Sequence, residues 1–414
     1  MRTCFAHRYL GFCLSCPGAS SAVFFISCFI ILLDNKRLGS LIRVLSLRPD
    51  GRGAMYVDVG FPVDYISARR AFLDSVEKVR EVGIPVDSHS LEVGGMGPEG
   101  TTLTVEMAVI APQRESMLIH SSGVHGVEGF AGSAMQCLIL DEVQGWYTPE
   151  ISVMLIHVVN PWGMAWWRRT NRNNVDLNRN FLSDGEEYSG MPELYSDITG
   201  FLNPRRPPKR FDPFIIRLLM AVIRHGRKNL KQAIAEGQYE DREGIFFGGE
   251  GLQEESAAIL GVLSEALLGV RKAMHIDFHT GLGKFGEDAL ILADEMDAPS
   301  LEIVFGPRIE GGSTAGVSYA NRGGFPACLI ARWPEIEWVG ITQEFGTFSN
   351  MAILKSMIVE NQLTHWSGLD GEECRTHPVR RRFMRGFNPD DQRWRESVLS
   401  RGRELFEQGL EFLR

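Results

Sequence analysis

The chain has 414 residues, of which 44% are hydrophobic and 23% are charged. These proportions are typical of a soluble globular protein with room for one large domain or two smaller ones. The formal net charge of −9 argues against a nucleic-acid-binding surface as the main function, because phosphate binding needs a basic face. We therefore expect no nucleic-acid partner.

The first 54 residues differ from the rest of the chain. Residues 22–33 are apolar except for Ser27, but a helix that spans a bilayer needs about 20 apolar residues. Three interpretations stay open: translation that starts at Met55, an export signal or anchor, and a disordered leader. The three cysteines beyond residue 28 are scattered and form no disulfide framework. We expect a reducing, cytoplasmic location, with export as the alternative if the apolar run is a signal.

From Met55 onward the pattern is that of an α/β domain. Apolar residues at helical spacing predict a helix over residues 67–82, and short apolar runs predict strands at 91–95, 102–110 and 117–121. A helix at 133–143 and a strand at 151–161 follow. Strand, glycine-rich loop, helix and strand in this order are typical of an α/β sheet.

Residues 183–260 are predicted to be a helical insertion. A connector rich in proline and arginine comes first, and a long helix follows. We expect one face of that helix to be buried, and we interpret the bases on its other positions as a solvated face. The apolar positions are Phe214, Ile215, Leu218, Leu219, Val222 and Ile223, and the bases are Arg217, Arg224, Arg227, Lys228 and Lys231.

After the insertion, residues 272–283 and 288–294 are predicted strands, and two further apolar runs lie near residues 326–333 and 338–347. A helix with an apolar face ends the chain. The simplest architecture is a single α/β domain over residues 55–414 that carries the insertion.

A histidine and a carboxylate three residues apart form the first candidate site. His125 and Glu128 stand in a loop with glycines at 123, 126 and 129. An imidazole nitrogen and a carboxylate oxygen can bind the same cation, and zinc accepts both. The alternative is a tight strand-to-helix turn in which His125 only forms hydrogen bonds. That alternative explains the glycines, which permit close backbone approach, but not the presence of two ligand-type side chains.

A second candidate is residues 166–181, which hold four arginines and five asparagines among apolar side chains. Interleaved apolar residues predict partial burial, and buried Arg and Asn need partners. An anionic ligand is one such partner, because the guanidinium group matches a carboxylate.

Two further candidates lie at the ends of predicted strands. His279 precedes a glycine turn, in a position where α/β proteins place functional groups. His275 lies in the middle of the same strand, and we interpret it as a core histidine. Glu344 ends a later apolar strand, and a carboxylate at that position is a candidate general base.

These motifs, in this order, resemble the zinc metallocarboxypeptidase family, and more closely a branch of it that is carried as a domain of unknown function. The most specific pieces are "GVHGVEG" and "VDLNRNF", and the resemblance covers residues 55–414. It implies a central mixed β-sheet flanked by helices, the phosphorylase/hydrolase-like α/β/α sandwich. It also implies one Zn²⁺ ion, with His125, Glu128 and His279 as ligands.

The resemblance also implies roles for the other candidates. Glu344 is expected to be the general base, and Arg168 to polarise the substrate carbonyl, although the sequence leaves open whether Arg168 or Arg169 faces the site. Asp176 is expected to orient a ligand histidine. The substrate carboxylate is expected to be held by Asn178 and Arg179. Tyr319 matches the family's mobile lid tyrosine loosely, and an ordinary surface-loop tyrosine is the alternative.

The expected function is hydrolysis of an amide bond next to a free carboxylate, in a small peptide or an acylated amino acid. An N-acyl amino acid deacylase on the same fold and a non-catalytic zinc-containing binding module are the alternatives. We expect no membrane partner, and the sequence leaves the oligomeric state open.

Overall fold

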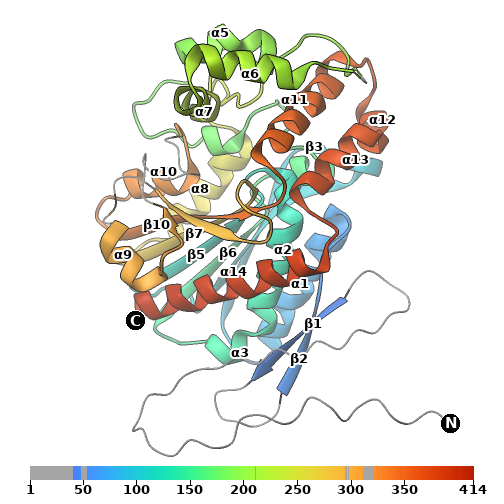
Figure 1. Cartoon of the computed structure of the whole chain (residues 1–414). Coiled ribbons are helices and arrows are strands. Elements are labelled where there is room, and N and C mark those ends of the chain that lie inside the picture. Colours follow the sequence, from blue (N-terminus) through green and yellow to red (C-terminus); the bar gives the residue numbers. More distant parts are fainter. Residues whose placement is uncertain (1–40, 48–53, 210, 294–295, 297, 311–320) are drawn as a thin grey trace, which may run out of the picture.

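A computed structural model describes residues 41–47, 54–209, 211–293, 296, 298–310 and 321–414 (Figure 1). Strands β1 (Leu41–Leu47) and β2 (Ala54–Gly60) pair antiparallel in a small sheet of their own. Most of the predicted leader and Tyr319 lie outside the described residues. Within the described residues, no helix combines the length and the apolar character needed to cross a bilayer.

The centre of the molecule is a mixed sheet of eight strands in the order β3-β4-β6-β5-β7-β10-β8-β9. Strands β6, β5, β7 and β10 are parallel to one another and form its middle. The strand bounds are β3 Val86–Met96, β4 Thr102–Ile110, β5 Ser116–Ser122, β6 Ile151–His157, β7 Lys272–Gly281, β8 Asp288–Leu292, β9 Ile309–Glu310 and β10 Glu337–Gly346. Nearly every residue of β5, β6, β7 and β10 is buried, as expected of parallel strands that helices cover on both faces.

Helices cover both faces of the sheet (Figure 1). One face packs against α1 (Tyr65–Glu81), α2 (Gly129–Asp141), α9 (Ala298–Phe305) and α14 (Gln392–Leu413). The other face packs against α4 (Pro161–Ala165), α8 (Glu254–Ala266) and α10 (Phe325–Arg332). The short helix α3 (Val143–Trp146) joins α2 to β6. The predicted α/β class, a mixed sheet between two helical layers, is confirmed.

A third group of helices lies beyond this sandwich, at the top of Figure 1. It contains α5 (Glu193–Leu202), α6 (Phe214–His225), α7 (Arg227–Glu236), α11 (Asn350–Trp366), α12 (Gly371–Thr376) and α13 (Pro378–Phe387). All of these except α12 contribute to an apolar cluster that also contains Val127, from the loop after β5. The apolar cluster that contains the insertion helices therefore extends to the loop that carries His125 and Glu128.

Some local predictions are wrong. The helix expected at 133–143 begins at Gly129, so Glu128 lies directly before its first turn. The apolar run near residue 328, whose type the sequence left open, is helix α10. The long helix predicted in the insertion is interrupted at Gly226, where the backbone takes φ +78°. Of its predicted apolar positions, only Phe214 is fully buried. Periodicity identifies an apolar face but not whether another element covers it.

Candidate metal centre

Strand order brings the candidate ligands together. His125 and Glu128 follow the carboxyl end of β5, and His279 lies near the carboxyl end of the neighbouring strand β7. Glu344 lies on β10, the next strand along, in direct register with His279. Because β5, β7 and β10 are parallel, their carboxyl ends meet at one edge of the sheet, where α/β proteins place functional groups.

The side chains of His125, Glu128 and His279 point at one another. The distance from His125 Nδ1 to Glu128 Oε1 is 3.0 Å, and His279 Nδ1 lies 3.2 Å from both Glu128 Oε2 and His125 Nδ1. One ligand atom from each residue lies within 4.8 Å of the other two, and all three residues are buried. Two imidazoles and one carboxylate form a donor set that suits zinc.

Each histidine is oriented by a carboxylate on its far side. Nε2 of His279 lies 2.7 Å from Asp277 Oδ2, and Nε2 of His125 lies 3.2 Å from Asp176 Oδ1. Such partners fix the orientation of the ring and leave Nδ1 for the cation. Asp176 thus lies beside His125. The sequence analysis missed Asp277, although it precedes His279 by two residues and so points to the same side of β7.

The electrostatic field of the cluster favours positive charge. Burial alone lowers the pKa of His279, but Asp277 and Glu128 reverse this effect and hold that pKa well above its usual value. Burial raises the pKa of Glu128, yet the two histidines hold it below its usual value. A metal cation competes with the proton for the same Nδ1 lone pair, so a site that retains this proton also favours a cation. The residues present therefore fit a metal ion.

Glu344 has the properties of a proton acceptor. Its Oε1 accepts a hydrogen bond of 2.8 Å from the backbone N–H of Leu282. Burial, together with the nearby Glu128 carboxylate, raises the pKa of Glu344 to about 7. A carboxylate whose pKa lies near neutrality can both accept and return a proton.

The structure distinguishes the two adjacent arginines. Arg169 lies against the cluster, with Nη1 3.5 Å from Glu128 Oε1 and Nε 2.9 Å from Asp176 Oδ2. Arg168 turns away: its Nε donates to Glu360 Oε1 at 3.0 Å and its Nη2 to Asn174 Oδ1 at 2.8 Å. The backbone carbonyl of Arg168 accepts a hydrogen bond from the N–H of Val127, and that of Arg169 accepts one from the N–H of Gly126. Both donors belong to the loop that carries His125 and Glu128, which we call the metal loop. Arg168 is therefore placed as an anchor of that loop, away from the metal cluster.

The two other residues expected to bind substrate are held by the protein itself. Arg179 donates to the backbone carbonyl of Ala235, in α7, from Nε at 2.9 Å and Nη2 at 2.5 Å, and from Nη1 to the carbonyl of Asn178 at 2.7 Å. The Asn178 side chain accepts from the backbone N–H of Phe325 at 3.1 Å. In this structure Arg179 thus links the insertion to the segment that carries Asp176.

Two glycines of the loop have distinct requirements. Gly123 has φ +66°, a conformation that favours glycine. At Gly126 a Cβ atom would lie 2.2 Å from the backbone carbon of Gly163 and 2.2 Å from the nitrogen of Met164. A side chain at position 126 would therefore clash with the backbone of α4 at Gly163 and Met164, and glycine avoids this clash.

Comparison with protein families identifies the chain at the level of its family. A model described as "Protein of unknown function (DUF2817)" matches residues 61–401. The chain belongs to the DUF2817 family. The resemblance to a branch of unknown function is thereby confirmed. Comparison with curated proteins found no match.

Several solved structures are similar to this DUF2817 member. The murein-tripeptide amidase MpaA from Escherichia coli O157 has 18% identity and a TM-score of 0.34, over 72% of this chain and 94% of that one. Carboxypeptidase A from Helicoverpa armigera has 15% identity and a TM-score of 0.38, over 77% and 73%. Bovine thrombin-activatable fibrinolysis inhibitor has 12% identity and a TM-score of 0.40, over 81% and 97%.

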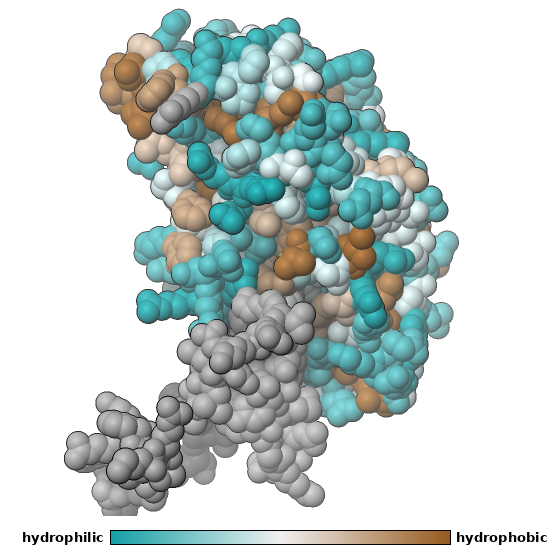
Figure 2. All heavy atoms as spheres, turned by 90° about the vertical axis from the view of Figure 1, so that its right-hand side faces the viewer, coloured by the Kyte–Doolittle hydropathy of each residue, from teal (hydrophilic) through white to brown (hydrophobic). Residues whose placement is uncertain are grey.

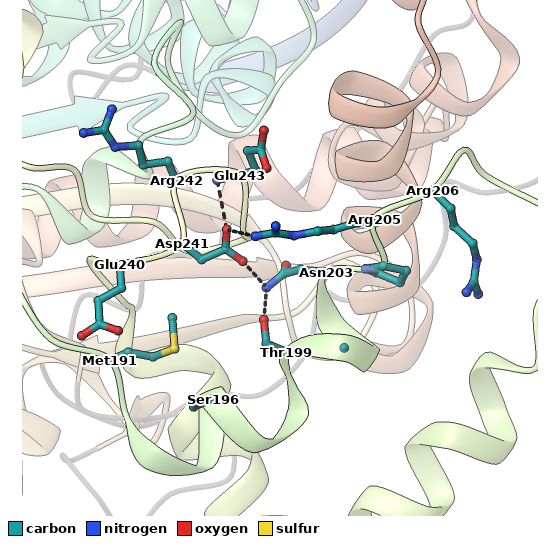
Figure 3. A pocket seen from close by; sticks show the side chains of 12 residues that line it. Met191, Ser196, Thr199, Asn203, Arg205, Arg206, Glu240, Asp241, Arg242 and Glu243 are labelled. Carbon is teal, nitrogen blue, oxygen red and sulfur yellow. Dashed lines mark hydrogen bonds and ion pairs between the residues drawn. The ribbon is translucent and has the colours of Figure 1, made fainter.

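The insertion of this DUF2817 protein covers the site. Phe246 lies over the guanidinium groups of both Arg169, at 5.3 Å, and Arg179, at 5.6 Å. A cavity of about 10 Å³ beside Arg169 is lined by Phe246, Ile245 and Phe383, among others. An open groove of about 850 Å³ lies elsewhere on the insertion, where Asp241 contacts Arg205 and Asn203 (Figure 3). None of the candidate site residues that the structure describes lines this groove.

Proposed function

We propose that the protein is a zinc-dependent hydrolase that cleaves an amide bond next to a free carboxylate. One observation carries the proposal: three buried ligand-type atoms of His125, Glu128 and His279 converge, and Glu344 lies in register beside His279 on the next strand. A set of three protein ligands with an adjacent carboxylate is typical of catalytic zinc sites, which leave one position for water or substrate.

His125, Glu128 and His279 would hold a single zinc ion. When bound, zinc supplies Lewis acidity toward a carbonyl oxygen and lowers the pKa of a water molecule to about 7. Asp176 and Asp277 keep the two imidazoles in the orientation that presents Nδ1.

Glu344 is the proposed general base. Its carboxylate accepts a proton from the attacking water and returns it to the leaving amine nitrogen, so one residue serves both halves of the reaction. The hydrogen bond from Leu282 holds the carboxylate in place. The pKa of about 7 favours this exchange, because the two protonation states are close in free energy at neutral pH.

Arg169 takes the role that the sequence analysis gave to Arg168. Its guanidinium lies against His125 and Asp176, whereas Arg168 is paired with Glu360. A fixed cation next to the site stabilises negative charge that develops on the carbonyl oxygen in the tetrahedral state. The same group could pair with the free carboxylate of the substrate.

The burial of the site favours a small substrate. The ligands are at most 4% exposed, and the insertion places Phe246 over Arg169. Hydrolysis of an N-acyl amino acid is therefore the second candidate function. The two activities use the same catalytic groups and differ only in whether the amide nitrogen belongs to the last residue of a peptide or to an acylated amino acid.

Metal analysis together with a substrate pair tests the proposal. Purified protein should contain about one zinc per chain, and His279→Ala should lose it. The zinc-loaded protein is then incubated with an N-acyl dipeptide and with an N-acyl amino acid. Cleavage of the first supports the carboxypeptidase-like activity, and cleavage of the second alone supports the deacylase. Zinc binding without turnover of any amide in a broad panel would favour the non-catalytic module, and full activity without metal would contradict all three.

A further inference from the structure

Helix α6 turns its apolar side toward the solvent. Ile215, Leu219 and Ile223 form one row along the helix, and Ile216 and Met220 form the next row. Each of these five side chains is between 56% and 75% exposed. Figure 2 shows hydrophobic side chains gathered at the top of the view, the end of the molecule to which α5, α6 and α7 belong.

The opposite side of α6 is fixed by packing. Phe214 is buried, and Leu218, Ala221 and Val222 pack against the apolar cluster formed with α5, α7 and α11. The orientation of the helix is therefore set by its inner side, and the exposed rows are not needed to hold it. A cluster of five large apolar side chains on one exposed ridge is unusual for the surface of a monomeric soluble protein.

The chain segment that contains the ridge carries an excess of positive charge. Residues 201–236 contain nine lysines and arginines and two acidic residues, within a chain whose net charge is −9. Exposed Lys209 precedes the helix, and exposed Arg224, Arg227 and Lys228 follow its apolar rows. Arg217 and Arg206 pair with Asp212, one of the two acidic residues.

We propose that α6 and the bases around it, the α6 surface, dock the protein on an anionic lipid bilayer. An amphipathic helix with apolar side chains on one side and bases beside them lies in the plane of a membrane, with the apolar side chains among the acyl chains and the bases at the phosphates. Side chains that are 56% to 75% exposed can enter a fluid bilayer without a matching groove, which a protein partner would need. This proposal replaces both the interpretation of the bases as a solvated face and the expectation that the protein has no membrane partner.

The α6 surface is connected to the candidate metal centre through α7. α7 follows α6 directly, and the carbonyl of Ala235 in α7 accepts two hydrogen bonds from Arg179. The α6 surface therefore holds the molecule at the membrane through the part of the chain that covers the site. The inference does not depend on the proposed catalytic activity, because it concerns binding alone.

Vesicle sedimentation tests the proposal with the full chain. The protein should sediment with vesicles of phosphatidylcholine containing about one third phosphatidylglycerol, should stay in solution with vesicles of phosphatidylcholine alone, and should dissociate as salt is added. The double variant Leu219→Ser/Ile223→Ser should bind the anionic vesicles at least about tenfold more weakly. Lys228→Gln should weaken binding about fivefold, because it removes one base near the lipid surface.

The control variant is Ile303→Ser, which removes a side chain on α9 that is 87% exposed and lies outside the α6 surface. It should bind like the parent, and circular dichroism should show that every variant is folded. Failure of the folded parent to bind anionic vesicles would overturn the proposal, as would equal binding to both vesicle types. A dimer in light scattering that Leu219→Ser/Ile223→Ser dissociates, without any vesicle binding, would instead make the α6 surface a self-association site.

Discussion

His279 and Asp277 lie two residues apart on the same side of β7, with Nε2 of the imidazole 2.7 Å from Oδ2 of the carboxylate. Both groups are buried, so solvent screens this contact little. Asp277 thus holds the His279 imidazole in place without a cation. A change at Asp277 therefore tests directly whether His125, Glu128 and His279 bind a metal.

We expect Asp277→Asn to weaken zinc binding by about 10- to 100-fold, although it removes no ligand. The amide is neutral and holds the imidazole less firmly, so His279 becomes a weaker ligand. Competition with a chromogenic chelator measures the affinity. Asp390→Asn, at an exposed position, is the control for loss of one negative charge and should leave the affinity unchanged. An unaltered affinity in Asp277→Asn would show that the carboxylate does not orient a ligand.

Glu344→Gln should retain zinc and lose activity by about 10²- to 10⁴-fold, because the amide cannot accept a proton. Zinc content and kcat are measured on the same preparation. A loss of both together would indicate a structural role.

The activity of the parent should depend on the ionisation of Glu344. Burial and Glu128 raise its pKa to about 7, and a bound cation lowers the pKa from there. Only the carboxylate form accepts a proton, so activity should be lost as the pH falls through the acid limb, with a midpoint at or below pH 7. A kcat profile from acid to neutral pH measures the midpoint, and a profile that rises toward acid would contradict the assignment.

The two arginines should separate into one structural and one functional residue. Arg168→Met leaves the buried Glu360 with Arg380 and the Thr364 hydroxyl as partners, and it should cost about 3 kcal/mol of unfolding free energy. Arg169→Met should lower kcat by about 10²-fold or more. It also leaves the buried Asp176 carboxylate without its guanidinium partner, so kcat and not stability separates the two variants. Urea unfolding and steady-state kinetics of both variants provide the comparison, and the reverse pattern would return the catalytic role to Arg168.

Gly126→Ala should disturb the metal loop without removing a ligand. The new methyl group would lie 2.2 Å from the backbone of Gly163, so either the loop or the start of α4 must move. We expect a loss of about 1–3 kcal/mol of stability and weaker zinc binding. Gly145→Ala is the matched control, because a Cβ atom at that position meets nothing within 4 Å.

His157 should make the protein sensitive to acid. Burial lowers its pKa to about 3, so the folded state keeps this imidazole neutral while the unfolded chain takes up a proton below its usual pKa. The stability contributed by the neutral form is therefore lost as the pH falls from about 6.5 toward 3. His157→Gln should reduce the loss of unfolding free energy between pH 7 and pH 5 by about 2 kcal/mol. Urea unfolding at both pH values measures this difference, with His89→Gln on the edge strand β3 as the control.

The convergence of His125, Glu128 and His279 could be predicted from the sequence, because each motif is short and marks the end of a strand. Parallel pairing of β5, β7 and β10 brings these ends to one edge. The choice between Arg168 and Arg169 was not predictable, because it depends on Glu360, which lies 192 residues away in the chain. The exposure of the apolar rows of α6 was not predictable either, since nothing in a helical pattern states which side is covered.

The register of β7 with β10 has a consequence for how this protein tolerates change. Glu344 and His279 are direct neighbours on adjacent strands, so their backbones are separated by one inter-strand step of about 4.8 Å, a spacing that hydrogen bonds in the sheet enforce. Loops around the site can lengthen, shorten or acquire new helices without altering that step. Substrate preference can therefore diverge through the insertion while the spacing between the proposed base and its neighbouring ligand stays constant.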